Sequence, residues 1–203
     1  DIYTTSSCSG RVTLFRDGSA DKGGTWLVAE HSYATESQIF DALRPYLNST
    51  DAALLPAPAV PSSEPAAIPE QSVSGDNADA DSDANADDME GNIHLRYEGF
   101  ILAIEARTLE AASHFLTLAH QCGYRDSGIT AVAKRYIVNV RGALRVDAPV
   151  VLAGRLVVNC AYVRSVLALA NAKQRRNFAK IDAFTDALKA VSHLFSSRSA
   201  AAA

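Results

Sequence analysis

The sequence predicts an α+β protein with a mixed sheet, flanking helices and further helices at its C-terminal end. Three observations support this class. Segments that alternate apolar and polar residues, as half-buried strands do, are interleaved with segments of helical periodicity in no regular βαβ order. No Gly-x-Gly-x-x-Gly run follows any of these strands, so a Rossmann-type nucleotide site is not indicated. Two segments are similar to each other: CSGRVTLFR (8–16) and DSGITAVAK (126–134) both place Ser-Gly directly before a strand. This similarity indicates two similar half-units, although two identities in nine positions also arise by chance.

Residues 1–50 are expected to form the N-terminal half of the domain. RVTLFRD (11–17) and TWLVAEH (25–31) have strand alternation and flank a glycine-rich turn, which predicts a hairpin. Residues 36–47 have apolar side chains at helical spacing and predict a short helix. TTSSCSG (4–10) is rich in hydroxyls and poor in apolar residues, so we expect a loop there.

Residues 92–196 are expected to form the C-terminal half. The expected elements are a strand (93–106), a helix (108–123), a strand (131–141), extended chain broken at Pro149 and Gly154 (144–158), and helices (160–195). Thr108 is the expected N-cap of the first helix, and Gly123 lies where a left-handed C-terminal glycine is common. The basic run 173–176 marks where the last helical segment is expected to break. Residues 197–203 are expected to be a frayed tail.

An acidic, proline-rich insertion separates the two halves. Residues 51–91 hold ten of the 23 acidic side chains, five of the seven prolines and no Lys or Arg. Such a composition buries too little apolar surface to offset the entropy of ordering, so we expect disorder. The rest of the chain then has 19 basic and 13 acidic side chains, a formal charge of +6 against −4 for the whole. A mildly basic folded part suits RNA or another polyanion.

The overall composition narrows the class of protein further. With 203 residues, 48% of them hydrophobic, the chain can bury a moderate core, and no apolar run reaches the ~18 residues that span a bilayer. The three cysteines, Cys8, Cys122 and Cys160, form no Cys-x-x-Cys motif and no disulfide framework, which favours a reducing, cytoplasmic location. The chain begins at Asp1 without a methionine or a signal-peptide pattern, so we expect a fragment that lacks its natural N-terminus.

Two loops carry the strongest chemical signals. In SSCSGR (6–11), small hydroxyl residues before a glycine favour a tight turn whose backbone N–H groups bind carboxylate or phosphate oxygens. YRDSG (124–128) repeats this chemistry with a cation and a carboxylate. A serine-rich turn at a sheet edge is the alternative interpretation of the first loop. The histidines and cysteines show no metal-ligand spacing, so no metal is expected.

Five segments resemble one known family. They are DIYTTSSCSGR (1–11), KGGTWLVAEH (22–31), GFILAIEARTLEAA (99–112), GYRDSGI (123–129) and NCAYVRSVLALAN (159–171), and they are similar to the third wybutosine-synthesising enzyme of tRNA. That family methylates a tricyclic guanosine derivative, a 7-(3-amino-3-carboxypropyl)-4-demethylwyosine, at a ring nitrogen. The base lies just 3′ of the anticodon in phenylalanine tRNA, and S-adenosylmethionine is the methyl donor. The resemblance covers residues 1 to about 190 apart from the insertion, and it implies an unusual α+β methyltransferase fold.

The resemblance also implies roles for individual residues. His31 or Asp1 would take the proton of the methylated nitrogen. The residues that would bind the cofactor are Ser7, Ser9, Gly10, Trp26, Ser127 and Gly128. The residues that would hold tRNA phosphates or the acidic side chain of the base are Arg11, Lys22, Arg125 and Arg141.

Two departures from the family pattern keep other functions open. The basic, helical segment that normally precedes the Asp1 position is absent here, and the acidic insertion replaces a shorter connection. A non-catalytic RNA-binding module of the same fold would explain the basic folded part but not both hydroxyl-rich loops. A third hypothesis is S-adenosylmethionine-dependent methylation of a different tRNA nucleotide. The sequence leaves the oligomeric state open.

Overall fold

The computed structural model describes residues 2–18, 23–47, 91–132 and 135–192. In chain order the elements are β1 (Ile2–Cys8), β2 (Arg11–Arg16), β3 (Thr25–Glu30), α1 (Glu36–Leu43), the 3-10 turn η1 (Arg44–Tyr46), β4 (Ile93–Glu98), β5 (Ile101–Ala106), α3 (Leu109–Gln121), β6 (Gly128–Val132), β7 (Arg135–Arg141), β8 (Arg145–Leu152), β9 (Arg155–Leu156) and α4 (Cys160–Ala190). The predicted insertion and the predicted frayed tail lie outside the described residues, apart from Gly91.

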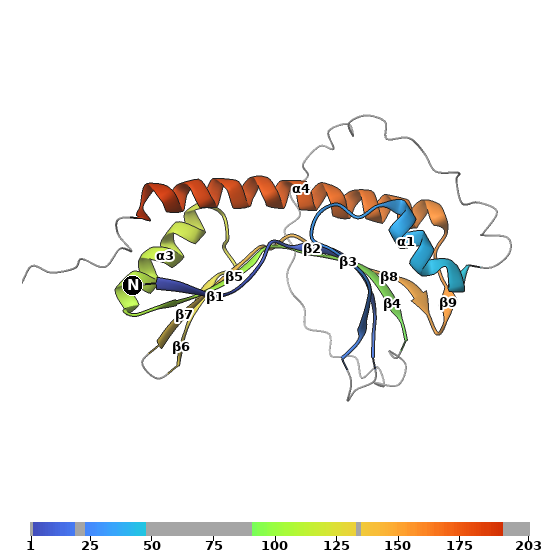
Figure 1. The fold of residues 1–203 in the computed structure, drawn as a ribbon, viewed down its shortest axis with the longest axis horizontal. Coiled ribbons are helices and arrows are strands. Elements are labelled where there is room, and N and C mark those ends of the chain that lie inside the picture. Colours follow the sequence, from blue (N-terminus) through green and yellow to red (C-terminus); the bar gives the residue numbers. More distant parts are fainter. Residues whose placement is uncertain (1, 19–22, 48–90, 133–134, 193–203) are drawn as a thin grey trace, which may run out of the picture.

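The strands form two antiparallel sheets that lie end to end beneath α4 (Figure 1). One sheet has the order β1-β5-β7-β6 and the other the order β3-β2-β4-β8-β9. The α+β class is confirmed, but the single mixed sheet that we expected is two sheets, and every described strand pair is antiparallel. α3 packs on the first sheet and α1 on the second (Figure 1).

The chain passes between the sheets three times, and each connection contains a glycine. Residues 9–10 join β1 to β2, residues 99–100 join β4 to β5, and residues 142–144 join β7 to β8. We call this region the waist. A Cβ on Gly99 would lie 3.1 Å from the Leu144 carbonyl oxygen and 3.2 Å from that of Gly142. The glycines therefore allow the connections to pass close to one another.

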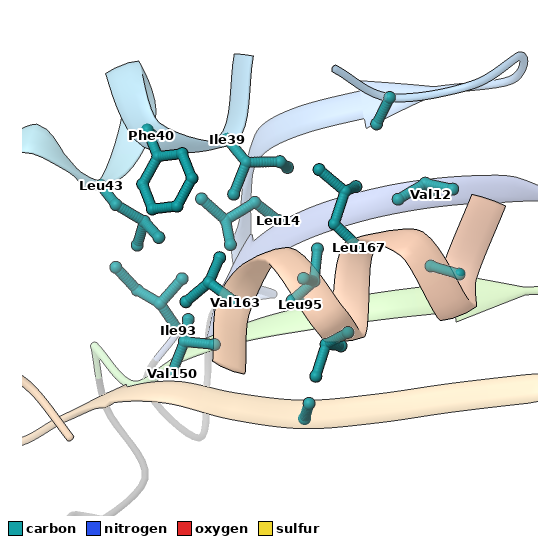
Figure 2. Packing of buried hydrophobic residues seen from close by; sticks show 14 of the residues in the cluster. Val12, Leu14, Ile39, Phe40, Leu43, Ile93, Leu95, Val150, Val163 and Leu167 are labelled. Atoms are coloured by element: carbon teal, nitrogen blue, oxygen red, sulfur yellow. The ribbon is translucent and has the colours of Figure 1, made fainter. Parts of the chain in front are cut away.

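Each sheet has its own hydrophobic core on the side of α4. Figure 2 shows the core of the five-stranded sheet, where α1 and the first turns of α4 meet the strands. Its labelled residues include Leu14, Ile39, Leu43, Leu95, Val150, Val163 and Leu167. Phe115 of α3 and Phe184 of α4 lie 5.9 Å apart, ring to ring, in the core of the four-stranded sheet. No described element covers the opposite faces of the two sheets.

Several predicted elements differ from the structure. Residues 4–8 are not a loop but most of β1, an edge strand whose side chains stay largely exposed, so it needs no apolar residues. The predicted strand 93–106 is two strands in different sheets, divided at Gly99. The predicted strand 131–141 is a hairpin that begins at Gly128. Thr108 is the N-cap of α3, as predicted, and its side chain accepts from the Ala111 N–H.

The C-terminal region is one helix rather than several. α4 runs through 31 residues, about 46 Å, and does not break at 173–176. Gln174, in the middle of this basic run, is fully buried above the waist, whereas Arg175 and Arg176 are exposed. The run is therefore the place where α4 bridges the two cores. Among the described residues, no helix is long and apolar enough to cross a membrane.

Candidate active site at the waist

Strand register brings two rows of side chains together on the uncovered face of the waist. Cys8, Ile101 and Arg141 are opposite one another across the four-stranded sheet. Their neighbours Leu102 and Val140 face the core, so this row faces away from α4. On the five-stranded sheet, the matching row at the waist is Arg11, Glu98 and Arg145. Each connection joins one row to the other, so the rows flank the waist.

His31 lies at this waist although it is 23 residues from Cys8 in sequence. Its Nδ1 is 3.1 Å from the carbonyl oxygen of Gly10 and 3.8 Å from the Sγ of Cys8. A carbonyl oxygen only accepts hydrogen bonds, so this contact assigns the proton of the neutral imidazole to Nδ1. The lone pair is then on Nε2, which is the atom able to accept a proton.

Arg11 belongs to a stack of cations and aromatic rings on the five-stranded sheet. Its Nε donates to the Glu98 carboxylate at 2.6 Å, and its guanidinium carbon lies 4.0 Å from the centre of the Trp26 ring. The Trp26 ring in turn lies 4.7 Å from that of Phe15. Trp26 nevertheless keeps 44% of its surface exposed. The indole therefore leaves part of its apolar surface open to solvent beside the waist, next to the Arg11 guanidinium.

Side-chain amides of α4 hold the backbone of this site from the other side. Asn177 donates to the Ser9 carbonyl at 2.7 Å and accepts from the Phe100 N–H at 3.0 Å, and so ties two of the three connections. Gln174 donates to the His31 carbonyl at 2.8 Å. Both amides are almost fully buried, at 2% and 0% exposure, so they stabilise these backbone positions without competition from water.

The second loop lies at the same end of the four-stranded sheet. The Ser127 hydroxyl oxygen accepts from the Arg141 backbone N–H at 3.1 Å, which leaves the hydroxyl proton free to donate. With strands about 4.8 Å apart, Arg141 and Cys8 are separated by roughly 10 Å, two strand spacings. A Cβ on Gly128 would meet no atom within 4 Å, so the space beside this glycine is open.

The structure does not bring all the predicted site residues together. Ser7 shares a register row with Leu102, a core residue, so it does not lie on the uncovered face with Cys8. Ser9 contributes its backbone carbonyl, and Arg125 is exposed in the turn before Ser127. Asp1 and Lys22 lie outside the described residues. No group of three or more His, Cys, Asp or Glu side chains within the described ranges is placed to hold a metal ion.

Four residues of this site were missed by sequence analysis: Glu98, Arg145, Gln174 and Asn177. Glu98 and Arg145 are charged residues at strand ends, and their sequence pattern does not distinguish them from ordinary residues on an exposed sheet face. Gln174 and Asn177 carried a signal, because they continue the buried helical stripe of Val163, Val166, Leu167 and Ala170. Polar residues on an apolar stripe predict buried hydrogen bonds.

Comparison with solved structures first defines the fold. A protein from Pyrococcus horikoshii (PH1069) aligns with a TM-score of 0.64 and 22% identity, over 91% of this chain and 75% of its own. A hypothetical protein from Aeropyrum pernix aligns with a TM-score of 0.62 and 18% identity, over 91% of this chain and 86% of its own. These likenesses show that the arrangement of two sheets and a long helix occurs in archaeal proteins.

Comparison of sequences then defines the family. The family model "Methyltransferase TYW3" matches residues 1–190, so the chain belongs to the TYW3 methyltransferase family, and the resemblance found in the sequence is confirmed. The "tRNA wybutosine-synthesizing protein 3" of Schizosaccharomyces pombe is 29% identical over 154 residues, which is 74% of this chain. The rice "tRNA wybutosine-synthesizing protein 2/3/4" is 27% identical over 204 residues, 94% of this chain.

An archaeal relative carries a more specific name. The Pyrococcus abyssi "tRNA(Phe) 7-((3-amino-3-carboxypropyl)-4-demethylwyosine(37)-N(4))-methyltransferase 1" is 25% identical over 192 residues, 93% of this chain and 77% of its own length. The chain spans 16% of the rice protein and 51% of the fission yeast protein. The activity of those longer proteins therefore comes to this chain only as a proposal.

Proposed function

We propose that this chain transfers a methyl group from S-adenosylmethionine to a ring nitrogen of the tricyclic wybutosine precursor 3′ of the anticodon in cytoplasmic tRNA-Phe. The observation that carries the proposal is the register at the waist, which brings Cys8 and Arg11 of the first motif loop to the same end of the sheets as Arg141. The backbone N–H of Arg141 donates to the Ser127 hydroxyl, so the second motif loop lies at this end too. Family membership and the name of the Pyrococcus relative support the same reaction.

The side chains at the waist fit the chemistry of S-adenosylmethionine. This molecule presents a purine ring, ribose hydroxyls, a carboxylate and two cationic groups. Trp26 offers a half-exposed indole beside the Arg11 guanidinium for contact with the purine, Ser127 has a hydroxyl proton to donate, and the open space at Gly128 permits close approach to backbone. We assign Trp26, Ser127 and Gly128, with Gly10 and Ser9, to the cofactor. When bound, the cofactor supplies an electrophilic methyl group on its sulfonium.

His31 is the proposed general base. A ring nitrogen that accepts the methyl group of the cofactor would also have to lose its proton, and a base at the waist would take that proton. The Gly10 carbonyl holds the tautomer that leaves Nε2 free, so Nε2 accepts this proton. Asp1 is the alternative base proposed from sequence. The amides of Gln174 and Asn177 keep the His31 and Ser9 backbone in place while the base acts.

Arg141 and Arg125 are proposed to bind the tRNA. Both are exposed, and neither forms an ion pair with a carboxylate within the part of the chain that the structure describes. An arginine without an ion pair can bind a phosphate at little cost in free energy, because no existing ion pair must break. Arg11, by contrast, is already paired with Glu98 and stacked on Trp26, so its role is to shape the site rather than to hold the phosphate backbone.

Labelled methyl transfer tests the proposal. The chain is mixed with S-adenosylmethionine carrying a labelled methyl group and with tRNA-Phe from cells that lack this step, and fully modified tRNA-Phe is the control. We expect label only in the first tRNA. Saturable cofactor binding without transfer would favour a different tRNA substrate. RNA binding with no cofactor binding would favour a non-catalytic RNA-binding module and would refute the proposal.

His31→Ala tests the base. We expect kcat to fall by at least about 100-fold, the lower range for loss of a general base, with little change in tRNA affinity. Because Gly10 and Gln174 contact His31 through Nδ1 and through the backbone, the His31→Gln variant is the matched control for packing. Unchanged kcat in His31→Ala would remove His31 from the mechanism. The pH profile of kcat separates a base from a structural role, since only loss of a base removes the acidic limb.

A further inference from the structure

A shallow hollow of about 190 Å³ opens on the uncovered face where β4 and β8 leave the waist. Its lining residues are Arg96, Tyr97, Glu98, Arg145, Val146 and Asp147. Glu98 and Arg145 are directly opposite each other in the register of the two strands. Opposed residues have Cβ atoms about 5 Å apart, so the hollow has a cation and a carboxylate side by side at its waist end.

Two charged groups in the hollow keep capacity for a ligand after their contacts with the described residues are counted. Arg145 is exposed and forms no ion pair with any carboxylate of the described residues, although Glu98 is its neighbour in register. Glu98 binds Arg11 through Oε2, and 39% of its side chain stays exposed. Asp147, in contrast, is occupied by the His94 Nδ1 at 2.7 Å and the Arg96 Nε at 3.1 Å. Arg145 and the second oxygen of Glu98 are therefore the two groups available to a ligand.

Two available groups of opposite charge select a particular kind of ligand. A phosphate would meet the Glu98 and Asp147 carboxylates, and a simple cation would meet Arg145, so either one encounters a like charge. An α-amino acid head group carries a carboxylate and an ammonium on the same carbon atom. Its carboxylate can accept from Arg145 in the planar two-bond geometry that arginine favours, while its ammonium donates to Glu98.

We propose that Arg145 and Glu98 form a subsite for an α-amino acid zwitterion. This inference rests on the proposed function, which supplies two sources of such a group. One is the 3-amino-3-carboxypropyl chain that the name of the Pyrococcus abyssi relative places on its substrate base, and the other is the methionine end of S-adenosylmethionine. In either case the subsite fixes the orientation of the molecule at the waist, next to the row formed by Cys8, Ile101 and Arg141.

The first arm of the test compares two tRNA substrates. One tRNA-Phe carries the aminocarboxypropyl chain on the tricyclic base, and the other carries 4-demethylwyosine without it. The Arg145→Gln variant is measured beside Arg155→Gln, which removes another exposed arginine from the same sheet. If the tRNA supplies the zwitterion, Arg145→Gln lowers kcat/KM on the chain-bearing tRNA by roughly 10- to 100-fold, the range for a charged hydrogen-bonded pair. The value for the chainless tRNA stays unchanged.

The second arm uses calorimetry to compare the binding of two compounds related to the cofactor. S-adenosylhomocysteine has the amino acid head group, and methylthioadenosine lacks it. If the cofactor supplies the zwitterion, Arg145→Gln and Glu98→Gln weaken binding of S-adenosylhomocysteine by a similar 10- to 100-fold and leave methylthioadenosine unaffected.

The outcomes of the two arms separate the inference from the proposed function. The zwitterion subsite is overturned if Arg145→Gln behaves like Arg155→Gln on both tRNAs and also leaves the binding of S-adenosylhomocysteine unchanged. It is overturned as well if a loss is the same for ligands with and without the head group. If the wild-type chain methylates neither tRNA, the proposed function fails, and the calorimetric arm then decides alone. Selective loss of S-adenosylhomocysteine binding would support the subsite in that case, and its absence would overturn it.

Discussion

Gly10 is a position where a single added methyl group meets both backbone strain and close packing. Its φ of +88° lies in the left-handed region, where an alanine costs about 1–2 kcal/mol. A Cβ there would also lie 2.9 Å from both the Asn177 Nδ2 and the Glu98 carbonyl oxygen, and 3.1 Å from the Gln174 Oε1. These atoms belong to backbone or to buried, hydrogen-bonded amides, so relief of the clash costs a further ~1–3 kcal/mol. We expect Gly10→Ala to lower the free energy of unfolding by about 2–5 kcal/mol.

Gly154 provides the matched control for this prediction. It lies in the turn between β8 and β9 with a φ of +72°, yet a Cβ there would meet no atom within 4 Å. Gly154→Ala therefore carries the backbone strain without the clash. Urea unfolding followed by circular dichroism gives both free energies, and their difference isolates the clash with the α4 amides and the Glu98 carbonyl. If Gly10→Ala costs no more than Gly154→Ala, α4 and the Glu98 carbonyl do not pack tightly on this connection, contrary to this prediction.

Two further predictions concern the buried polar groups of the waist. Asn177→Ala leaves the Ser9 carbonyl and the Phe100 N–H without their partner, so we expect a loss of about 2–4 kcal/mol in urea unfolding; a loss below 0.5 kcal/mol would show that these bonds contribute little. Burial raises the pKa of Tyr124 to about 12 and also raises that of Tyr97. Both phenols then stay neutral in the folded state above pH ~10, where the unfolded chain ionises. We therefore expect the free energy of unfolding to be at its full value below pH ~10 and to fall between pH 10 and 12. The double variant Tyr97→Phe/Tyr124→Phe should flatten this fall, and an equally steep decline in the variant would contradict the assignment.

The sequence alone determined the local elements where one pattern dominates. Residues 11–17 and 25–31 are paired strands because alternation and a glycine-rich turn agree, and β2 and β3 follow them closely. The α3 helix follows from its apolar spacing and its threonine cap. The motifs SSCSGR and YRDSG were enough to predict the family, because they depend on residue identity rather than on burial.

Period-two alternation, by itself, cannot say which sheet a strand joins. Residues 93–98 and 101–106 both alternate, and at Gly99 the core-facing positions change from odd to even numbers. This shift marks an irregularity in the pattern, but it does not show that the second strand joins a different sheet. β1 escaped prediction because an edge strand obtains its hydrogen bonds from β5 and needs no apolar side chains. The basic run of α4 interrupts the apolar helical stripe, and this suggested a break in the helix. In the structure the helix continues across two separate cores, which is a property of the tertiary fold.

In the candidate site, too, the sequence identified individual residues, whereas the tertiary structure decided which of them meet. The sequence identified Arg11, His31 and Arg141 as candidate site residues. An arginine carries a positive charge and a histidine can accept a proton whatever their position in the fold. Only strand register and the packing of α4 could place His31 beside Cys8, or Glu98 beside Arg145. The physical reason is that these contacts join residues 23 and 47 positions apart, and they form only when two sheets and a crossing helix meet at three glycine-containing connections.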